Sequence, residues 1–490
     1  MFSVAAEPEA FSSGEGAAAI DVSRTNDPAF KVLSEALTGY IVGVMYDGLG
    51  ENEEAVTEYR RAASFRNDVG VIHVELGSDL LLLKDLEGAA SELSKALEVD
   101  PENNRARLLM ALVHTAEGDY EKAGAMYAEI LERDPDNFKT LAFQAELFLS
   151  QGRYDKASGI YEKMLRISEN DTFLYFNLGM IYSKTNQLER AEESFKKAIE
   201  IDKGHLESQM VLGLVYEVEG NLPGAIKQYE VVTEIDPAYT KAYARAANLY
   251  YGLGESEKAV KQLRAMAQIE PLLPNSYLRI AAIHIEQGDL DSAKGILREA
   301  LSNGVEEASI YAALGYIETL EENDGRAVEY YTDAVRLDPG NGLYRFYLGG
   351  AMNNAGNRLS AIRVMEECID LGYTSPRVYN YLGYLYVTEG KKIDKAIGLI
   401  GKALEEDPDN GSYNDSMGWA FFKKGDIKKA VEYLEKAAKL APEDQVINDH
   451  LGDAYFRAGD IEKAREAWKK ALESDPENRK IRKKLKADVR

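Results

Sequence analysis

The chain has 490 residues with a formal net charge of −25, and 45% of its residues are hydrophobic. Such an acidic chain repels phosphate backbones and anionic lipid surfaces, which disfavours nucleic acid as a partner. No stretch approaches the roughly 18 uninterrupted apolar residues that a membrane-spanning helix needs. The single cysteine, Cys368, leaves no basis for a disulfide framework, and its position predicts a buried small side chain.

Residues 1–28 precede the regular part of the chain and are rich in Ser, Gly and Ala. The run Val4-Ala5-Ala6 is similar to the end of a secretory signal whose basic and apolar parts are missing. An ordinary flexible tail is the alternative interpretation, and both stay open. No cysteine lies nearby, so these residues give no support for a lipid anchor.

From there the chain repeats with a period of 34 residues, interrupted by a single step of 35. An alanine occupies the same helical position in thirteen consecutive periods, and such a period indicates stacked supersecondary units. These alanines are Ala55, Ala89, Ala123, Ala157, Ala191, Ala225, Ala259, Ala293, Ala327, Ala361, Ala396, Ala430 and Ala464. A quasi-one-dimensional array is therefore expected in place of several globular domains.

Each period predicts two helices joined by a short turn. A small residue such as Gly179 stands twelve positions before the alanine of the same period, so the two helices can approach closely. Polar or glycine-containing segments such as 424–426 end the first helix, and Asp-Pro pairs separate successive periods. The extra residue of the 35-residue step falls at Lys391-Lys392, where we expect a longer turn.

This frame, seen in Leu178-Gly179, Tyr182, Ala191, Phe195 and Ala198, resembles the tetratricopeptide repeat over residues 36–478. The resemblance implies an all-α solenoid: a right-handed superhelix of about thirteen helix-turn-helix repeats plus a C-terminal capping helix. We assign residues 29–475 to the superhelix and 476–490 to the basic capping helix. In this family the first helix of each repeat lines a concave groove that receives peptides.

Signatures of catalysis are absent from the sequence. The five histidines are widely separated, without metal-ligand spacing or a cysteine partner. Gly14-Glu15-Gly16 weakly imitates a nucleotide-binding loop but follows no predicted strand. We therefore expect no enzyme activity, no cofactor and no metal.

Two clusters stand out at the predicted groove positions. The first is basic and polar, with Arg245 and Arg279 one period apart, and such guanidinium pairs favour carboxylates. Nearby glutamates such as Glu207 or Glu286 are the competing partners for these arginines. The full first cluster is Lys241, Arg245, Asn248, Asn275 and Arg279.

The second cluster is aromatic. Asp415, Trp419 and Phe422 have the spacing of one helix face, while Met417, Gly418 and Phe421 are expected to face neighbouring helices. Aromatic side chains in a groove are candidate hot spots, although packing between repeats would explain them equally well. The full second cluster is Tyr316, Phe346, Tyr384, Asp415, Trp419, Phe422 and Phe456.

Residues 379–472 carry a more specific resemblance. The segments 379–384, 415–419 and 450–453, together with Trp468, are similar to bacterial envelope tetratricopeptide lipoproteins, some of which are adaptors of a carboxyl-terminal processing protease. That resemblance implies an envelope scaffold, although the lipid-modified cysteine of such lipoproteins is missing.

After Pro476 the chain is strongly basic, and Ile481 and Leu485 lie four residues apart on one helix face. A capping helix fits this pattern, because the end of a repeat array needs a polar outer side.

The sequence thus predicts a protein-binding scaffold, expected in the periplasm or at the outer membrane and otherwise in the cytoplasm. Its expected partner is a protein or peptide, such as an envelope protease. The alternative function is a cytosolic chaperone-type clamp for acidic C-terminal peptides. The leading lysine position of that clamp holds other residues here, namely Leu108, Ala142, Phe176, Met210 and Ala244.

Overall fold

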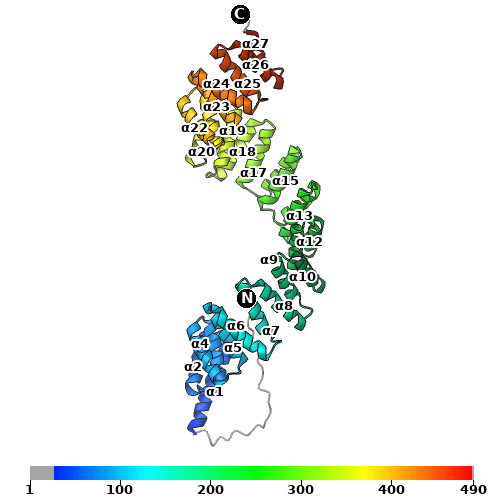
Figure 1. The fold of residues 1–490 in the computed structure, drawn as a ribbon, viewed down its shortest axis with the longest axis vertical. Helices are drawn as coiled ribbons and strands as arrows, with labels where there is room; N and C mark the ends of the chain where they lie inside the picture. Colours follow the sequence, from blue (N-terminus) through cyan, green and yellow to red (C-terminus); the bar gives the residue numbers. More distant parts are fainter. Residues whose placement is uncertain (1–26, 488–490) are drawn as a thin grey trace. The chain divides into compact units, whose positions relative to one another are not determined.

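The computed structural model describes residues 27–487, which form two compact units, residues 27–235 and residues 236–487. Within this range the chain forms 27 α-helices and no strand (Figure 1). Apart from Asp27 and Pro28, the expected signal-peptide remnant in residues 1–28 lies outside the described residues. The predicted all-α solenoid of thirteen helix pairs followed by one further helix is confirmed.

Unit 1 consists of six helix pairs. Their bounds are α1 Pro28–Leu49, α2 Asn52–Phe65, α3 Gly70–Leu82, α4 Leu86–Val99, α5 Asn104–Glu117, α6 Tyr120–Arg133, α7 Phe138–Ser150, α8 Tyr154–Ile167, α9 Thr172–Lys184, α10 Leu188–Ile201, α11 Leu206–Val218 and α12 Leu222–Ile235.

Unit 2 consists of seven helix pairs and the last helix. Their bounds are α13 Thr240–Gly252, α14 Ser256–Ile269, α15 Pro274–Glu286, α16 Leu290–Ser302, α17 Ala308–Leu320, α18 Asp324–Leu337, α19 Gly342–Asn354, α20 Arg358–Asp370, α21 Pro376–Thr388, α22 Ile393–Glu406, α23 Gly411–Lys424, α24 Ile427–Leu440, α25 Gln445–Ala458, α26 Ile461–Ser474 and α27 Arg479–Ala487.

Each helix packs most extensively against the other helix of its own pair. All thirteen repeat alanines are fully buried in these contacts. The small residue of the first helix faces a large side chain four positions beyond the alanine: an added Cβ on Gly179 would lie 2.7 Å from the Phe195 ring, and one on Gly452 would lie 2.4 Å from Trp468. The small residues therefore set the distance between paired helices, as the sequence predicts.

The turn inside each pair contains a residue in the left-handed conformation two residues before the second helix or, in the longest turn, three residues before it. It is glycine in ten pairs and Lys84, Asn186 or Glu322 in the other three. The 35-residue step lengthens this turn to residues 389–392, where Gly390 and Lys392 both have positive φ angles. The longer turn expected at Lys391-Lys392 is confirmed.

Proline carbonyls tie successive pairs together. A side chain six residues after a repeat proline donates a hydrogen bond to its carbonyl; Asn414 bonds Pro408 and Asn448 bonds Pro442, both at 3.0 Å. Arg107, Tyr277 and Arg345 contact Pro101, Pro271 and Pro339 in the same way. These bonds satisfy carbonyl groups at the point where the chain leaves one pair and enters the next.

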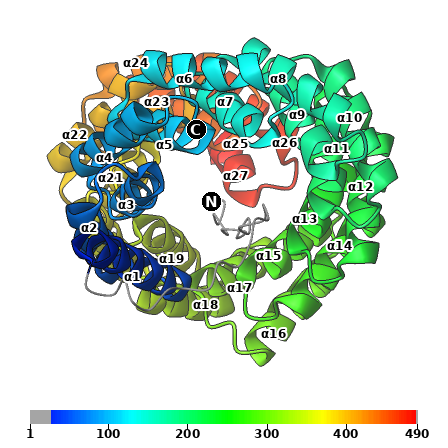
Figure 2. The same ribbon diagram turned by 90° about the horizontal axis from the view of Figure 1, so that it is seen from below.

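Within unit 2 the first helix of each pair lies on the inner side of the curve and the second on the outer side (Figure 2). The predicted binding residues are on the inner helices α13, α15, α17, α19, α21, α23 and α25. At the end of the array α27 packs against α26, with Ile481 buried and Leu485 against the Trp468 cluster. Cys368 is buried as predicted, and burial raises the pKa of its thiol to about 11.

Candidate partner-binding surface

The basic cluster lies on α13 and α15, two successive inner helices of unit 2. Arg279 donates a hydrogen bond from α15 to the Asn248 side-chain oxygen on α13, so the structure brings these two predicted residues together. Among the described residues Arg279 forms no ion pair, and partial burial lowers the pKa of its guanidinium. The expected competitor Glu286 accepts a hydrogen bond from the Tyr251 hydroxyl instead.

The other members of this cluster are exposed. Lys241 and Arg245 lie on α13 with Asn248, and Asn275 begins the first turn of α15. Glu207, the other expected competitor, belongs to unit 1. The cluster is therefore a polar, cation-bearing surface on two neighbouring inner helices.

The aromatic cluster centres on Trp419 of α23. Its ring stacks on Phe422 at 4.7 Å between centroids and on His450 of α25 at 3.9 Å. His450 Nδ1 lies 2.9 Å from the Oδ1 atom of Asp415, which is buried. Asp415 thus orients His450 beneath Trp419 and is not presented to a partner, while Met417, Gly418 and Phe421 are buried as predicted.

The remaining predicted aromatic residues differ in exposure. Tyr316 on α17 and Phe456 on α25 are 47% and 44% exposed. Phe346 packs edge-on against Tyr381 at 6.0 Å, and Tyr384 is half-buried. Some members of this cluster therefore pack between repeats, whereas others are exposed to a partner.

Two cations that the sequence analysis did not identify lie over these rings. Lys423 Nζ is 4.9 Å from the centroid of Trp419, and Arg457 Cζ is 5.7 Å from that of Phe422. Both are exposed and, within residues 27–487, neither forms an ion pair. Lys423 and Arg457 are 34 residues apart and so occupy the same position in successive repeats. A comparison of this position across the repeats would have found both cations.

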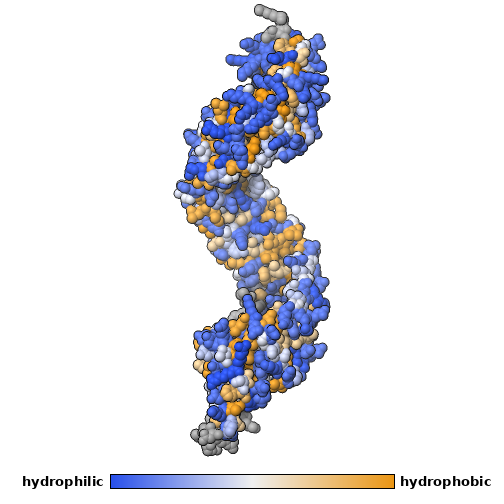
Figure 3. Space-filling model, turned by 90° about the vertical axis from the view of Figure 1, so that its left-hand side faces the viewer, coloured by the Kyte–Doolittle hydropathy of each residue, from blue (hydrophilic) through white to orange (hydrophobic). Residues whose placement is uncertain are grey.

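We call Tyr316, Trp419, Phe422, Lys423, Phe456 and Arg457 the aromatic surface of unit 2. It offers apolar rings for a side chain, and a cation over each of the two stacked rings Trp419 and Phe422 for a carboxylate. On the face of the molecule that Figure 3 shows, apolar patches alternate with hydrophilic surface. No group of His, Cys, Asp or Glu within residues 27–487 is arranged to hold a metal ion.

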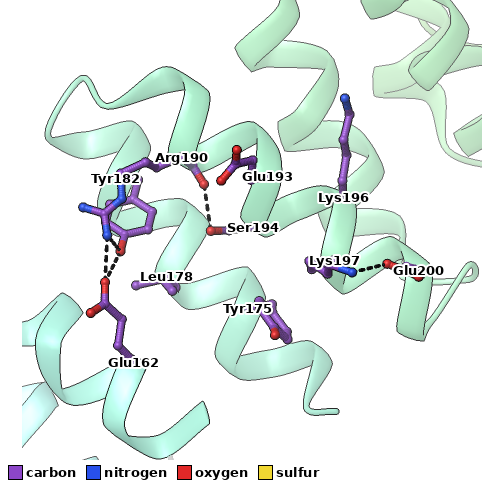
Figure 4. Close-up of a pocket in the computed structure, with 10 residues that line it drawn as sticks. All are labelled: Glu162, Tyr175, Leu178, Tyr182, Arg190, Glu193, Ser194, Lys196, Lys197 and Glu200. Atoms are coloured by element: carbon purple, nitrogen blue, oxygen red, sulfur yellow. Dashed lines mark hydrogen bonds and ion pairs between the residues drawn. The ribbon is translucent and has the colours of Figure 1, made fainter. Parts of the chain in front are cut away.

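A cavity of about 480 Å³ lies in unit 1 between α8, α9 and α10 (Figure 4). Its cations are already paired: Arg190 contacts Glu162 at 2.7 Å, Lys196 contacts Glu192 at 2.6 Å and Lys197 contacts Glu200 at 2.7 Å. Arg190 also lies 4.0 Å above the Tyr182 ring. This cavity therefore offers a ligand little unpaired charge, and none of the predicted binding residues lines it.

Comparison with protein-family models identifies the repeats. Four models described as tetratricopeptide repeat match residues 80–147 and 421–489, residues 140–175, residues 174–205, and residues 278–342 and 382–445. Together these matches cover more than half of the chain. The chain is a tetratricopeptide repeat protein.

Several solved structures are similar to the chain at low sequence identity. Naa15/Naa10 bound to HypK-THB is 17% identical, with 88% of this chain and 67% of that chain covered and a TM-score of 0.44. The Cut9-Hcn1 hetero-tetramer of the APC/C is 14% identical, with 94% of this chain and 98% of that chain covered and a TM-score of 0.42. Yeast Tom70 is 16% identical, with 93% of this chain and 96% of that chain covered and a TM-score of 0.34. No curated protein matches the chain in sequence.

Tetratricopeptide repeats support a role as a protein-interaction scaffold, and no catalytic family is indicated. Within residues 27–487 no helix combines the length and apolar character needed to cross a membrane. The family match therefore assigns an architecture and a general role, and the particular partner has to be inferred from the surfaces.

Proposed function

We propose that this tetratricopeptide repeat protein is a non-enzymatic adaptor that binds a segment of a partner protein on the aromatic surface of unit 2. The observation that carries the proposal is the Trp419–Phe422 stack, with Lys423 and Arg457 over its rings and in no ion pair. The segment would place an apolar side chain on the rings and a carboxylate between the two cations.

The exposed aromatic rings allow this surface to bind an apolar side chain of the partner. Tyr316 and Phe456 expose nearly half of their surface, and rigid aromatic side chains lose little conformational entropy when a partner covers them. Arg279, held by Asn248, would add a second contact for acidic groups of a longer segment.

Selection of a displayed peptide library on the purified chain tests this proposal. Enriched peptides should contain an apolar or aromatic residue next to Asp, Glu or the terminal carboxylate. Their affinity should fall at least tenfold in the Tyr316→Ala, Phe456→Ala double variant. Tyr120→Ala is the matched control, because Tyr120 is 41% exposed and lies on α6, the second helix of its pair in unit 1.

Two outcomes of the selection would contradict the proposal. One is peptides whose affinity is equal in the double variant, the control and the unmodified chain. The other is peptides without apolar residues. Amidation of the peptide C-terminus separates the alternative function: a clamp for acidic C-termini loses binding on amidation, whereas an internal carboxylate beside an apolar residue does not.

We also propose that the protein works in the bacterial envelope, with an envelope protease among its partners. The support is the sequence resemblance of residues 379–472; of the residues that carry it, Trp419 stacks on His450, and His450 contacts Asp415. Immunodetection after cell fractionation tests the location. Recovery of the protein in the cytoplasmic fraction alone would contradict it.

A further inference from the structure

The first helix exposes an unusually apolar face. Between Pro28 and Leu49, the only charged residue in the exposed class is Lys31. Six exposed apolar side chains recur at helical spacing along one side of α1: Leu33, Leu37, Ile41, Val44, Met45 and Leu49, with exposed fractions of 44 to 71%. Monomeric proteins rarely leave such a contiguous stripe in water, so this face is expected to be covered.

The stripe is symmetric about its centre. Leu33 and Leu49 lie eight residues to either side of Ile41, and Leu37 and Met45 lie four residues to either side. The same symmetry pairs the small Ser34 with Gly48, where an added Cβ would meet no atom within 4 Å. An antiparallel copy of α1 centred on Ile41 would therefore place uncharged residues opposite uncharged residues where the two helices cross, with Leu37 and Met45 on either side of Ile41.

Charge selects the antiparallel arrangement over the parallel one. Lys31 lies ten residues before Ile41, and the exposed Glu51 lies ten residues after it, followed by the exposed Glu53 and Glu54. An antiparallel pair brings each Lys31 to the level of the acidic turn of the other copy. A parallel pair would bring the two lysines together, which is unfavourable.

A membrane surface fits this face less well. Helices that lie on membranes carry Lys and Arg along their polar side, whereas α1 has one lysine in a chain of net charge −25. We infer that α1 is the interface of a twofold-symmetric homodimer, in which Ile41 meets Ile41 of the second copy. Two paired helices form a small interface, so the dimer is expected to dissociate on dilution.

Sedimentation equilibrium of the full chain across concentration tests this inference. The unmodified chain should dimerise, and Ile41→Asp should weaken the dimer at least tenfold, because the twofold axis places two new charges side by side. Leu359→Asp is the matched control, since Leu359 is 63% exposed on α20 and lies outside the interface. Circular dichroism should show unchanged helix content, because Ile41 is already half exposed.

A charge exchange and a crosslink test the register. Lys31→Glu alone and Glu51→Lys alone should each weaken the dimer, and the double variant should restore it. Ile41→Cys should give a covalent dimer with a short bismaleimide, while Leu359→Cys should not; the native Cys368 is buried. A chain that stays monomeric at about 100 µM, or an Ile41→Asp variant that dimerises normally, would overturn the inference, and Ile41-dependent binding to zwitterionic vesicles by a monomer would assign the face to a membrane.

Discussion

Two carboxyl groups in unit 1 share a buried site. Asp79 is 4% exposed, and the Tyr59 hydroxyl donates to Asp47 at 2.5 Å. One oxygen of each aspartate has no hydrogen-bond partner in the described structure. Burial, together with the hydrogen bond and charge of Asp47, raises the pKa of Asp79 to about 8, whereas Arg105 nearby acts in the opposite direction. The folded chain therefore favours the protonated form of Asp79 up to a higher pH than the unfolded chain does.

This raised pKa predicts a pH dependence of stability. Above the ordinary pKa of 3.8 the unfolded chain releases the proton that the folded chain keeps, so the stabilising contribution is complete below about pH 4 and declines as the pH rises toward 8. Asp79→Asn removes this titration. The free energy of unfolding of the unmodified chain should decrease when the pH is raised from 5 to 7. In Asp79→Asn this decrease should be smaller by at least about 1 kcal/mol.

Denaturant unfolding at the two pH values measures the difference. Asp136→Asn is the control, because Asp136 is exposed in a turn of the same unit. Equal pH dependence in Asp79→Asn and the unmodified chain would show that Asp79 is ionised in the folded state.

At the scale of elements, tyrosine–glutamate hydrogen bonds connect neighbouring helix pairs. Tyr182 donates to Glu162 and Tyr455 donates to Glu435, each at 2.6 Å, from a first helix to the second helix of the preceding pair. Tyr216 with Glu192 and Tyr386 with Glu366 repeat the arrangement. A cation covers the rings, as Lys463 does 5.3 Å from the centroid of Tyr455. Burial raises the pKa of these phenols, so each remains a donor.

Removal of one such hydroxyl should weaken the contact between pairs. Tyr455→Phe should lower the free energy of unfolding of unit 2 by about 1 kcal/mol, the usual net contribution of a buried hydrogen bond. A double-mutant cycle with Glu435→Gln measures the coupling, and additive effects would mean that the bond contributes nothing. Tyr433→Phe is the control, since the Tyr433 ring stacks on Phe421 while its hydroxyl has no hydrogen bond to a described residue.

The periodic elements could be predicted from sequence because their causes are local. A buried alanine facing a large side chain, a turn residue with positive φ and an Asp-Pro pair recur at fixed offsets, so alignment of the repeats reveals them. The tyrosine–glutamate bonds join residues 20 to 24 positions apart in different repeats. These bonds can be predicted only when it is known which second helix faces which first helix. The sequence of a single repeat does not contain this information.

At the scale of the whole molecule, each helix pair within a unit mainly contacts the neighbouring pairs of that unit. A substitution that destabilises one helix pair should therefore affect that pair and its neighbours and leave distant pairs unchanged. Gly179→Ala would place a methyl group 2.7 Å from the Phe195 ring and should destabilise α9 and its neighbours by about 1–3 kcal/mol. Hydrogen exchange should accelerate in α8–α11 and stay unchanged in α1–α4.

Gly159→Ala is the control for this experiment. Its added methyl group would meet no atom within 4 Å, so it should leave exchange unchanged or slow it slightly. Faster exchange along all of unit 1 in Gly179→Ala would show that the unit unfolds as a whole.

The candidate site could be located by helix but not by side chain. Sequence periodicity places Trp419, Phe422 and Arg279 on inner helices. It does not reveal that Asp415 is buried against His450, or that Lys423 and Arg457 lie over the rings. These relations depend on rotamers and on contacts between repeats, and neither follows from the position of a residue within its own repeat.

The thirteen buried alanines and the large side chains that face them have a consequence for the history of such proteins. They hold each helix pair together without using the exposed positions of the inner helices. A few codon changes at those exposed positions can therefore exchange one partner for another while the architecture is inherited intact. Two descendants of this chain could keep every repeat recognisable and share no ligand. Sequence similarity between repeat proteins therefore reports common ancestry and is a poor guide to their binding partners.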